Sequence, residues 1–172
     1  MGRFSGIPWA LIFFIIQTIT LLFVVLAGFL DVLQSLHSIG CYTAWGYVEH
    51  CAPPATHAYA ECPEMRPTMC AASAFALISL FLATVSCVLG GLRMLACIVL
   101  KPWGTLTLSG AIALTLLVSW ACIAGVQTKL CGRTHDGAFE PTYEYAAGFR
   151  LLLLGWIMQV LATGVAALMV FM

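Results

Sequence analysis

Four apolar segments, each long enough to cross a lipid bilayer, constrain the fold of this chain more than any other feature. Their approximate bounds are residues 7–30, 71–92, 105–126 and 148–171. A helix of about 20 apolar residues crosses a hydrocarbon core of ~30 Å. Because 62% of the 172 residues are hydrophobic and only 8% are charged, a water-soluble fold could not bury them. The sequence therefore predicts an all-α membrane protein, with one domain over residues 1–172 built as a four-transmembrane-helix bundle. It leaves open whether Met94–Leu100 extends the second helix or lies along the membrane surface.

Charged residues predict the orientation of this bundle. Arg3 precedes the first span, and Arg93 and Lys101 lie between the second and third spans, with no acidic residue on that side. The two other loops, about residues 31–70 and 127–147, hold, together with Arg150, four basic and all seven acidic residues, a net charge of −3 against +3. Because Lys and Arg favour the cytosolic side and one side lacks acidic residues altogether, we expect cytosolic termini and two exoplasmic loops, with the plasma membrane or cell surface as the location of this multi-pass protein.

Cysteines gather in the first exoplasmic loop, where Cys41, Cys51, Cys62 and Cys70 are disulfide candidates. Four cysteines allow three pairings, and proximity in the sequence favours Cys41–Cys51 and Cys62–Cys70. Such bridges suit a small ectodomain outside the reducing cytosol. Cys131, in the second loop, is left over; a bond to a partner chain, a free thiol and a different pairing all stay open for it.

The sequence lacks the residue patterns that enzymes, metal sites and nucleic-acid-binding surfaces use. It has no Gly-x-Ser-x-Gly motif, no phosphate-binding glycine loop and no carboxylate pair at mid-membrane, so we expect no enzyme activity and no cofactor. His37, His50 and His57 share the first loop with the cysteines, but their spacing is not that of a zinc site, and we expect no bound metal. Zero net charge without a basic cluster argues against nucleic acid as a partner.

A short segment between the first two spans resembles a known family signature. It reads Cys-Tyr-Thr-Ala-Trp-Gly-Tyr-Val-Glu-His-Cys and is similar to the signature of the amastins, surface proteins of trypanosomatid parasites with a claudin-like architecture. The most characteristic positions are matched by Cys41, Thr43, Trp45, Gly46 and Cys51. The number of spans, the loop lengths and the chain size are similar over nearly the whole chain. Three positions depart from the usual pattern and suggest a divergent member, namely Ala44, Val48 and His50.

The resemblance implies a more detailed fold. The two exoplasmic loops would form a small, disulfide-stabilised antiparallel β-sheet on top of a left-handed four-helix bundle. Trp45 would anchor this sheet at the membrane surface, because tryptophan combines a large apolar body with one N–H donor. Amastins are called surface glycoproteins, but this chain contains no Asn, which excludes N-linked glycosylation.

These observations favour a non-enzymatic membrane protein that acts through protein–protein interaction, either by its ectodomain or laterally in the membrane. The expected partners are membrane lipid and other membrane proteins or further copies of this chain. The main alternative is a structural or accessory subunit of a larger membrane complex. A membrane thiol–disulfide oxidoreductase is less favoured, because efficient exchange uses a Cys-x-x-Cys pair and neither exoplasmic loop contains one.

Overall fold

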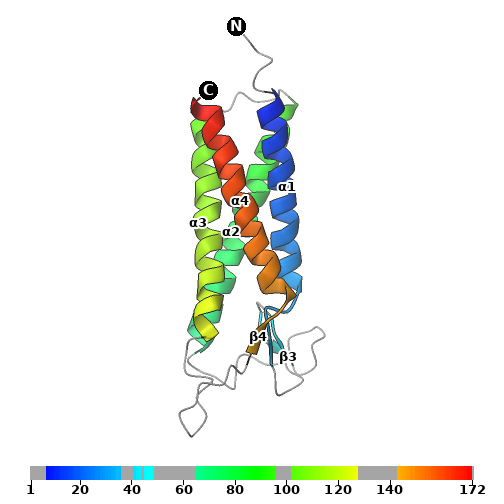
Figure 1. Ribbon diagram of the computed structural model, residues 1–172, viewed down its shortest axis with the longest axis vertical. Helices are drawn as coiled ribbons and strands as arrows, with labels where there is room; N and C mark the ends of the chain where they lie inside the picture. The colour runs from blue at the N-terminus through cyan, green and yellow to red at the C-terminus, as the bar shows by residue number, and fades with distance from the viewer. Residues whose placement is uncertain are drawn as a thin grey trace, which may run out of the picture.

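Four long helices form the body of the molecule in this computed structural model, which describes residues 7–35, 41–43, 45–48, 65–95, 102–127 and 143–171. The helices are α1 (Ile7–Phe29), α2 (Met65–Met94), α3 (Pro102–Gln127) and α4 (Ala147–Phe171) (Figure 1). In lipid a backbone must satisfy its hydrogen bonds within the segment, so long apolar runs become helices. Each helix is long and apolar enough to cross a membrane, which confirms the predicted four-span fold.

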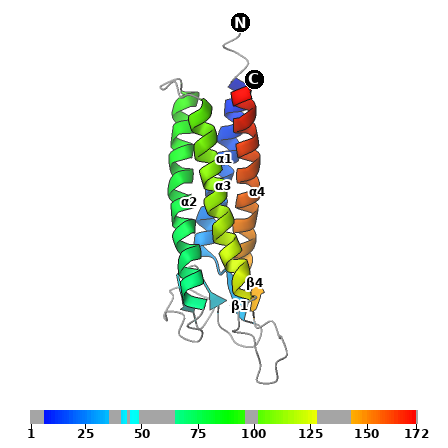
Figure 2. The ribbon, with the colours of Figure 1, turned by 90° about the vertical axis from the view of Figure 1, so that its left-hand side faces the viewer.

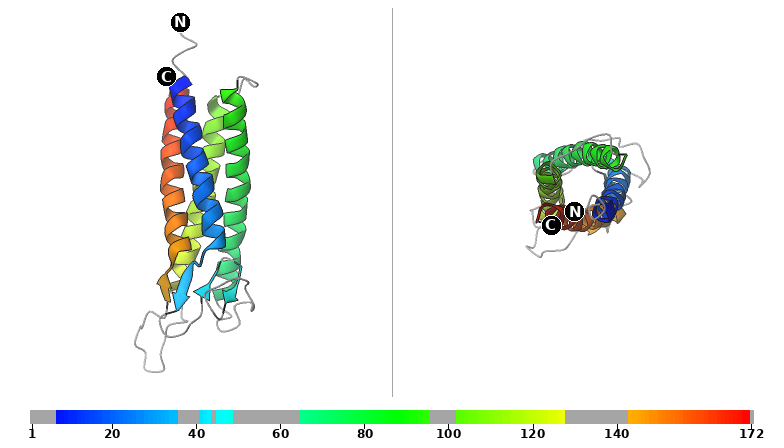
Figure 3. Two further views of the ribbon diagram at one scale, coloured as in Figure 1. Left: turned by 90° about the vertical axis from the view of Figure 1, so that its right-hand side faces the viewer. Right: turned by 90° about the horizontal axis from the view of Figure 1, so that it is seen from above.

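The helices stand in a ring, in which α1 packs on α2 and α4, and α3 packs on the same two helices (Figure 3). The start of α1 and the end of α4 lie at one end of the bundle, and the β-strands lie at the other (Figures 1 and 2). We call these the terminal end and the sheet end.

A four-stranded antiparallel sheet covers the sheet end. Its strands are β1 (Leu33–Ser35), β2 (Cys41–Tyr42), β3 (Tyr47–Val48) and β4 (Tyr143–Tyr145), in the order β3-β2-β1-β4. Leu33 pairs with Tyr42 on one side and with Tyr145 on the other. The central strand thus joins segments that are far apart in the sequence, and the sheet implied by the family resemblance is confirmed.

One apolar core runs from the helices into the sheet. Leu33 and Tyr42 are completely buried and belong to the same cluster as Val24, Met69 and Phe149, which come from α1, α2 and α4. Because sheet and bundle share these contacts, the positions of β1 and β2 are fixed by the helix ends that they contact.

The start of α2 changes the predicted place of Cys70. The helix begins at Met65, before the predicted span over residues 71–92, and Pro67 is tolerated in its first turn, where backbone N–H groups have no helical partner. Cys70 therefore lies within α2 as an exposed free thiol, and the predicted Cys62–Cys70 bridge is wrong. Cys62 itself lies outside the described residues. At its other end α2 stops at Met94, Leu95 follows in a turn, and the rest of the Met94–Leu100 stretch is outside the described residues.

Candidate functional site

The loop between β2 and β3 holds three of the signature residues, and Thr43 organises it. The Thr43 backbone N–H donates to the carbonyl of Gly46 at 2.9 Å. The Thr43 hydroxyl donates to the same carbonyl at 3.0 Å and accepts hydrogen bonds from the backbone N–H groups of Trp45 and Gly46, each at 3.2 Å. Threonine hydroxyls often satisfy nearby backbone groups in this way, so a single side chain holds the described residues of the tight loop together.

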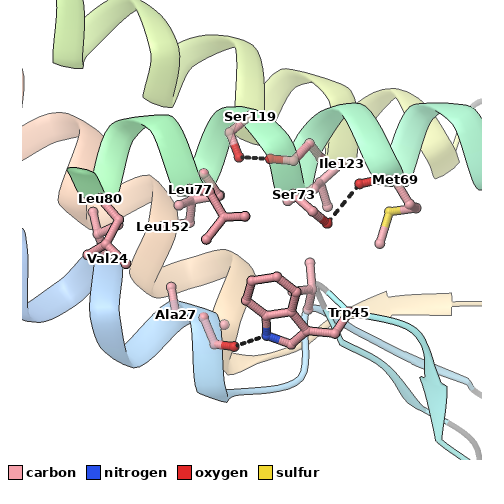
Figure 4. Close-up of a pocket in the computed structure, with 15 residues that line it drawn as sticks. Val24, Ala27, Trp45, Met69, Ser73, Leu77, Leu80, Ser119, Ile123 and Leu152 are labelled. Carbon is pink, nitrogen blue, oxygen red and sulfur yellow. Dashed lines mark hydrogen bonds between the residues drawn. The ribbon is translucent and has the colours of Figure 1, made fainter. Parts of the chain in front are cut away.

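Trp45 connects this loop to the bundle. Its indole Nε1 donates a hydrogen bond of 2.9 Å to the carbonyl of Gly28 in the last turn of α1 (Figure 4). That carbonyl is available because the last four carbonyls of a helix have no partner within the helix. The indole remains 58% exposed. Trp45 is thus fixed in orientation while it presents more than half of its surface outward.

An apolar pocket of about 50 Å³ lies beside the Trp45 ring, bordered by α1, α2, α3 and α4 (Figure 4). Its two hydroxyl groups both donate to backbone carbonyls, Ser73 to Met69 and Ser119 to Ala72, each at 2.9 Å. Among the described lining residues none is acidic or basic and none has a thiol. The described lining therefore offers mainly hydrocarbon contact.

The end of α1 and the start of α4 are in close contact next to the Trp45 loop. The Gly148 N–H donates to the Asp31 carbonyl at 2.8 Å, and the Ala146 N–H donates to the Val32 carbonyl at 3.0 Å. Gly148 has no room for a side chain, since a Cβ atom would lie 2.7 Å from the Asp31 carbonyl oxygen.

Burial raises the pKa of the Asp31 carboxyl and of the Tyr145 phenol above their ordinary values. Tyr145 also stacks on Phe149, with ring centroids 4.1 Å apart.

Two glutamines lie in the core of the membrane-spanning bundle, and both are completely buried. The Gln159 amide donates to the Ser109 hydroxyl at 2.9 Å and to the Ser109 carbonyl at 3.2 Å, and the Ser109 and Thr163 hydroxyls are 2.9 Å apart. These bonds join α4 to α3. The amide atoms of Gln17 find no hydrogen-bond partner in the described part of the chain.

The structure brings some of the predicted site residues together, while others lie outside the described residues. Thr43, Trp45 and Gly46 are brought together in one hydrogen-bonded loop. Cys41 is buried in β2 and disulfide-bonded, whereas Cys51 lies outside the described residues, so the pairing of these two cysteines stays a prediction. The described residues contain no cluster of His, Cys, Asp and Glu that could hold a metal ion. The three loop histidines considered above, His37, His50 and His57, are outside them.

Sequence reasoning missed Gly28 and Gly148, two glycines at the junction between the sheet and the ends of α1 and α4. Gly28 contributes only its carbonyl to Trp45, and a backbone role of this kind leaves no recognisable pattern in the sequence. Gly148 was visible as the first residue of the fourth predicted span, yet its closeness to the Asp31 and Leu30 carbonyls follows only from the packing of α4 on α1.

Comparison with protein families gives one match. A family described as Amastin surface glycoprotein matches residues 18–165, which is most of the chain. Comparison with curated proteins and with solved structures gave no match. The matched region includes all four helices in whole or in part and the complete sheet.

Proposed function

The chain belongs to the amastin family of surface proteins, and from this premise we propose that it acts by binding other proteins through the sheet end of its bundle. The observation that carries the proposal is that Trp45 is both fixed and exposed: the hydrogen bond to Gly28 sets its orientation, and the residue is 58% exposed. Rigid, partly exposed tryptophans are over-represented at protein interfaces and often contribute much of the binding energy. The partners that fit this surface are other membrane proteins or a further copy of the chain.

The proposal includes an orientation in the plasma membrane. Arg93 lies in the last turn of α2, at the terminal end, where the described residues include no acidic group. Asp31 and Glu144 lie at the sheet end together with Arg150. Because the described part of the terminal end carries a basic residue and no acidic one, the bias of Lys and Arg toward the cytosol supports cytosolic termini and an exoplasmic sheet. Epitope tags at both termini should then bind antibody only in permeabilised cells; binding in intact cells would reverse the orientation.

The interaction can be tested on protein purified from native membranes in a mild detergent. We expect stoichiometric co-purification of another membrane protein or a stable homo-oligomer, identified by mass spectrometry and by mass in solution. Trp45→Ala should weaken this association, while Trp103→Ala serves as the matched control, because Trp103 is similarly exposed (60%) but lies at the terminal end.

The outcomes separate the proposal from its alternatives. A folded Trp45→Ala variant that keeps its partners as well as the Trp103→Ala control would show that this surface is not the binding site. Loss of partners in both variants would indicate lateral association along the helices, as expected for an accessory subunit. Folding of each variant is checked by its circular dichroism melting curve before the comparison is made.

A further inference from the structure

A second cavity lies at the terminal end of the bundle, opposite the sheet. It has a volume of about 190 Å³ and is lined by residues from all four helices, including Phe13 of α1, Arg93 of α2, Leu108 of α3 and Met169 of α4. A single bound water needs only about 15 Å³ of such space. The cavity is therefore large enough for a group of several heavy atoms.

The polar groups of this cavity lack protein partners. Ser86 is only 2% exposed, and no described residue makes a hydrogen bond to its hydroxyl, in contrast to the buried hydroxyls of Ser79, Ser109 and Ser119, which all bond protein atoms. Arg93 also lines the cavity and forms no ion pair with a described residue. Arg93 is half-buried, and neither donor would have to give up a bond to a described residue in order to bind a ligand.

The position of Arg93 suits a ligand at the membrane surface. Arg93 follows Ser86 by two turns of α2, a separation of about 10 Å along the helix axis, and it lies in the last turn of the helix. Cα–Cβ bonds in a helix tilt toward its N-terminus, which is the direction of Ser86 from Arg93, and both residues line the cavity. Its described lining thus combines the cation of Arg93, the hydroxyls of Ser86 and Thr105, and apolar side chains.

This combination fits an anionic headgroup. A guanidinium forms strong, charge-assisted and often bidentate hydrogen bonds to phosphate or carboxylate oxygens. We propose that the terminal-end cavity binds the headgroup of an anionic phospholipid, with its charged oxygens on Arg93 and a further oxygen on the Ser86 hydroxyl. The acyl chains would remain in the bilayer beside the bundle. The orientation proposed above places this end in the cytosolic leaflet, where anionic phospholipids are concentrated.

The test measures headgroup preference on the full-length protein. Purified protein in a mild detergent is mixed with equal amounts of phosphatidylserine and phosphatidylcholine that carry identical acyl chains, and the bound lipid is counted by native mass spectrometry. We expect wild type to retain phosphatidylserine over phosphatidylcholine by about tenfold, as a hydrogen bond to a charged group implies. Arg93→Gln should abolish this preference. Arg150→Gln is the matched control, since Arg150 is exposed at the sheet end of α4, and it should leave the preference intact.

A second variant separates binding in the cavity from attraction to a surface charge. Ser86→Leu keeps Arg93 but fills the cavity with hydrocarbon, and since Ser86 makes no hydrogen bond to the described residues the fold should persist, as its circular dichroism melting curve would show. We expect this variant to lose the preference as well. An equal preference in wild type, Arg93→Gln and Ser86→Leu would overturn the proposal. So would release of the bound lipid by millimolar inorganic phosphate with phosphate retained in its place, because the cavity would then be a site for free phosphate.

Discussion

Replacing Gly148 with alanine should loosen the junction that holds the sheet on the bundle. The added Cβ atom would lie 2.7 Å from the Asp31 carbonyl oxygen and 2.8 Å from that of Leu30, whereas ordinary contact begins near 3.4 Å. Both obstacles are backbone atoms and cannot rotate away. The start of α4 would have to retreat from the end of α1 by several tenths of an ångström, which also stretches the 2.8 Å hydrogen bond from the Gly148 N–H to Asp31.

The size of the effect follows from three contributions. Overpacking a tightly packed site costs about 1–3 kcal/mol, and a weakened hydrogen bond contributes up to about 1 kcal/mol. Alanine gains at most about 1 kcal/mol over glycine from its higher helix propensity, which offsets the hydrogen-bond loss. We therefore expect the free energy of unfolding to fall by about 1–3 kcal/mol in Gly148→Ala.

The assay is reversible unfolding in mixed detergent micelles, in which a denaturing detergent is titrated in and helix content is followed by circular dichroism. Two glycines of the same helix provide controls. Gly164→Ala meets nothing within 4 Å, and Gly155→Ala makes only ordinary contacts, the nearest at 3.5 Å; both should remain within about 1 kcal/mol of wild type. If Gly148→Ala proves as stable as Gly164→Ala, the junction adapts without cost and the steric argument is refuted.

Three further predictions concern the same region. Trp45→Phe keeps an aromatic ring but loses the 2.9 Å hydrogen bond to Gly28. The free energy of unfolding should therefore fall by about 0.5–1.5 kcal/mol in the same titration. An unchanged value would show that the indole N–H does not contribute to the stability of the protein. Thr43→Val keeps the branched shape but leaves two backbone N–H groups of the loop without their acceptor. Because these groups are exposed or only partly buried, the free energy of unfolding should fall by about 0.5–1.5 kcal/mol, whereas Thr43→Ser should lie closer to wild type. Because burial raises the pKa of Asp31, the folded state binds more protons than the unfolded state between the ordinary and the raised pKa. Wild type should therefore lose stability as the pH rises through that window, while Asp31→Asn should lack this loss; parallel pH profiles of melting temperature would contradict it.

The helices could be predicted almost completely, because their cause is local. A run of about 20 apolar residues placed in lipid must satisfy its own backbone groups, and a helix does so whatever its neighbours are. The prediction failed where polar residues lead into a span: Met65 to Cys70 continue α2 outward, so that Cys70 lies on a helix instead of in a loop. The loop residues Thr43, Trp45 and Gly46 were identified by family resemblance, and their hydrogen-bonding roles were not visible in the sequence.

The sequence by itself thus determined that the chain spans a membrane four times, which residues form the spans and which family signature the first loop carries, since these depend on hydropathy and on residue identity along the chain. Only the tertiary structure decided that β4 pairs with β1, that Trp45 donates to Gly28, and that Ser86 and Arg93 of α2 line one cavity together with residues of α1, α3 and α4. Each of these arrangements joins different elements of the chain, and each exists because the packing of four helices brings the elements together. Interactions of that kind depend on distances in space, which the order of the residues does not contain.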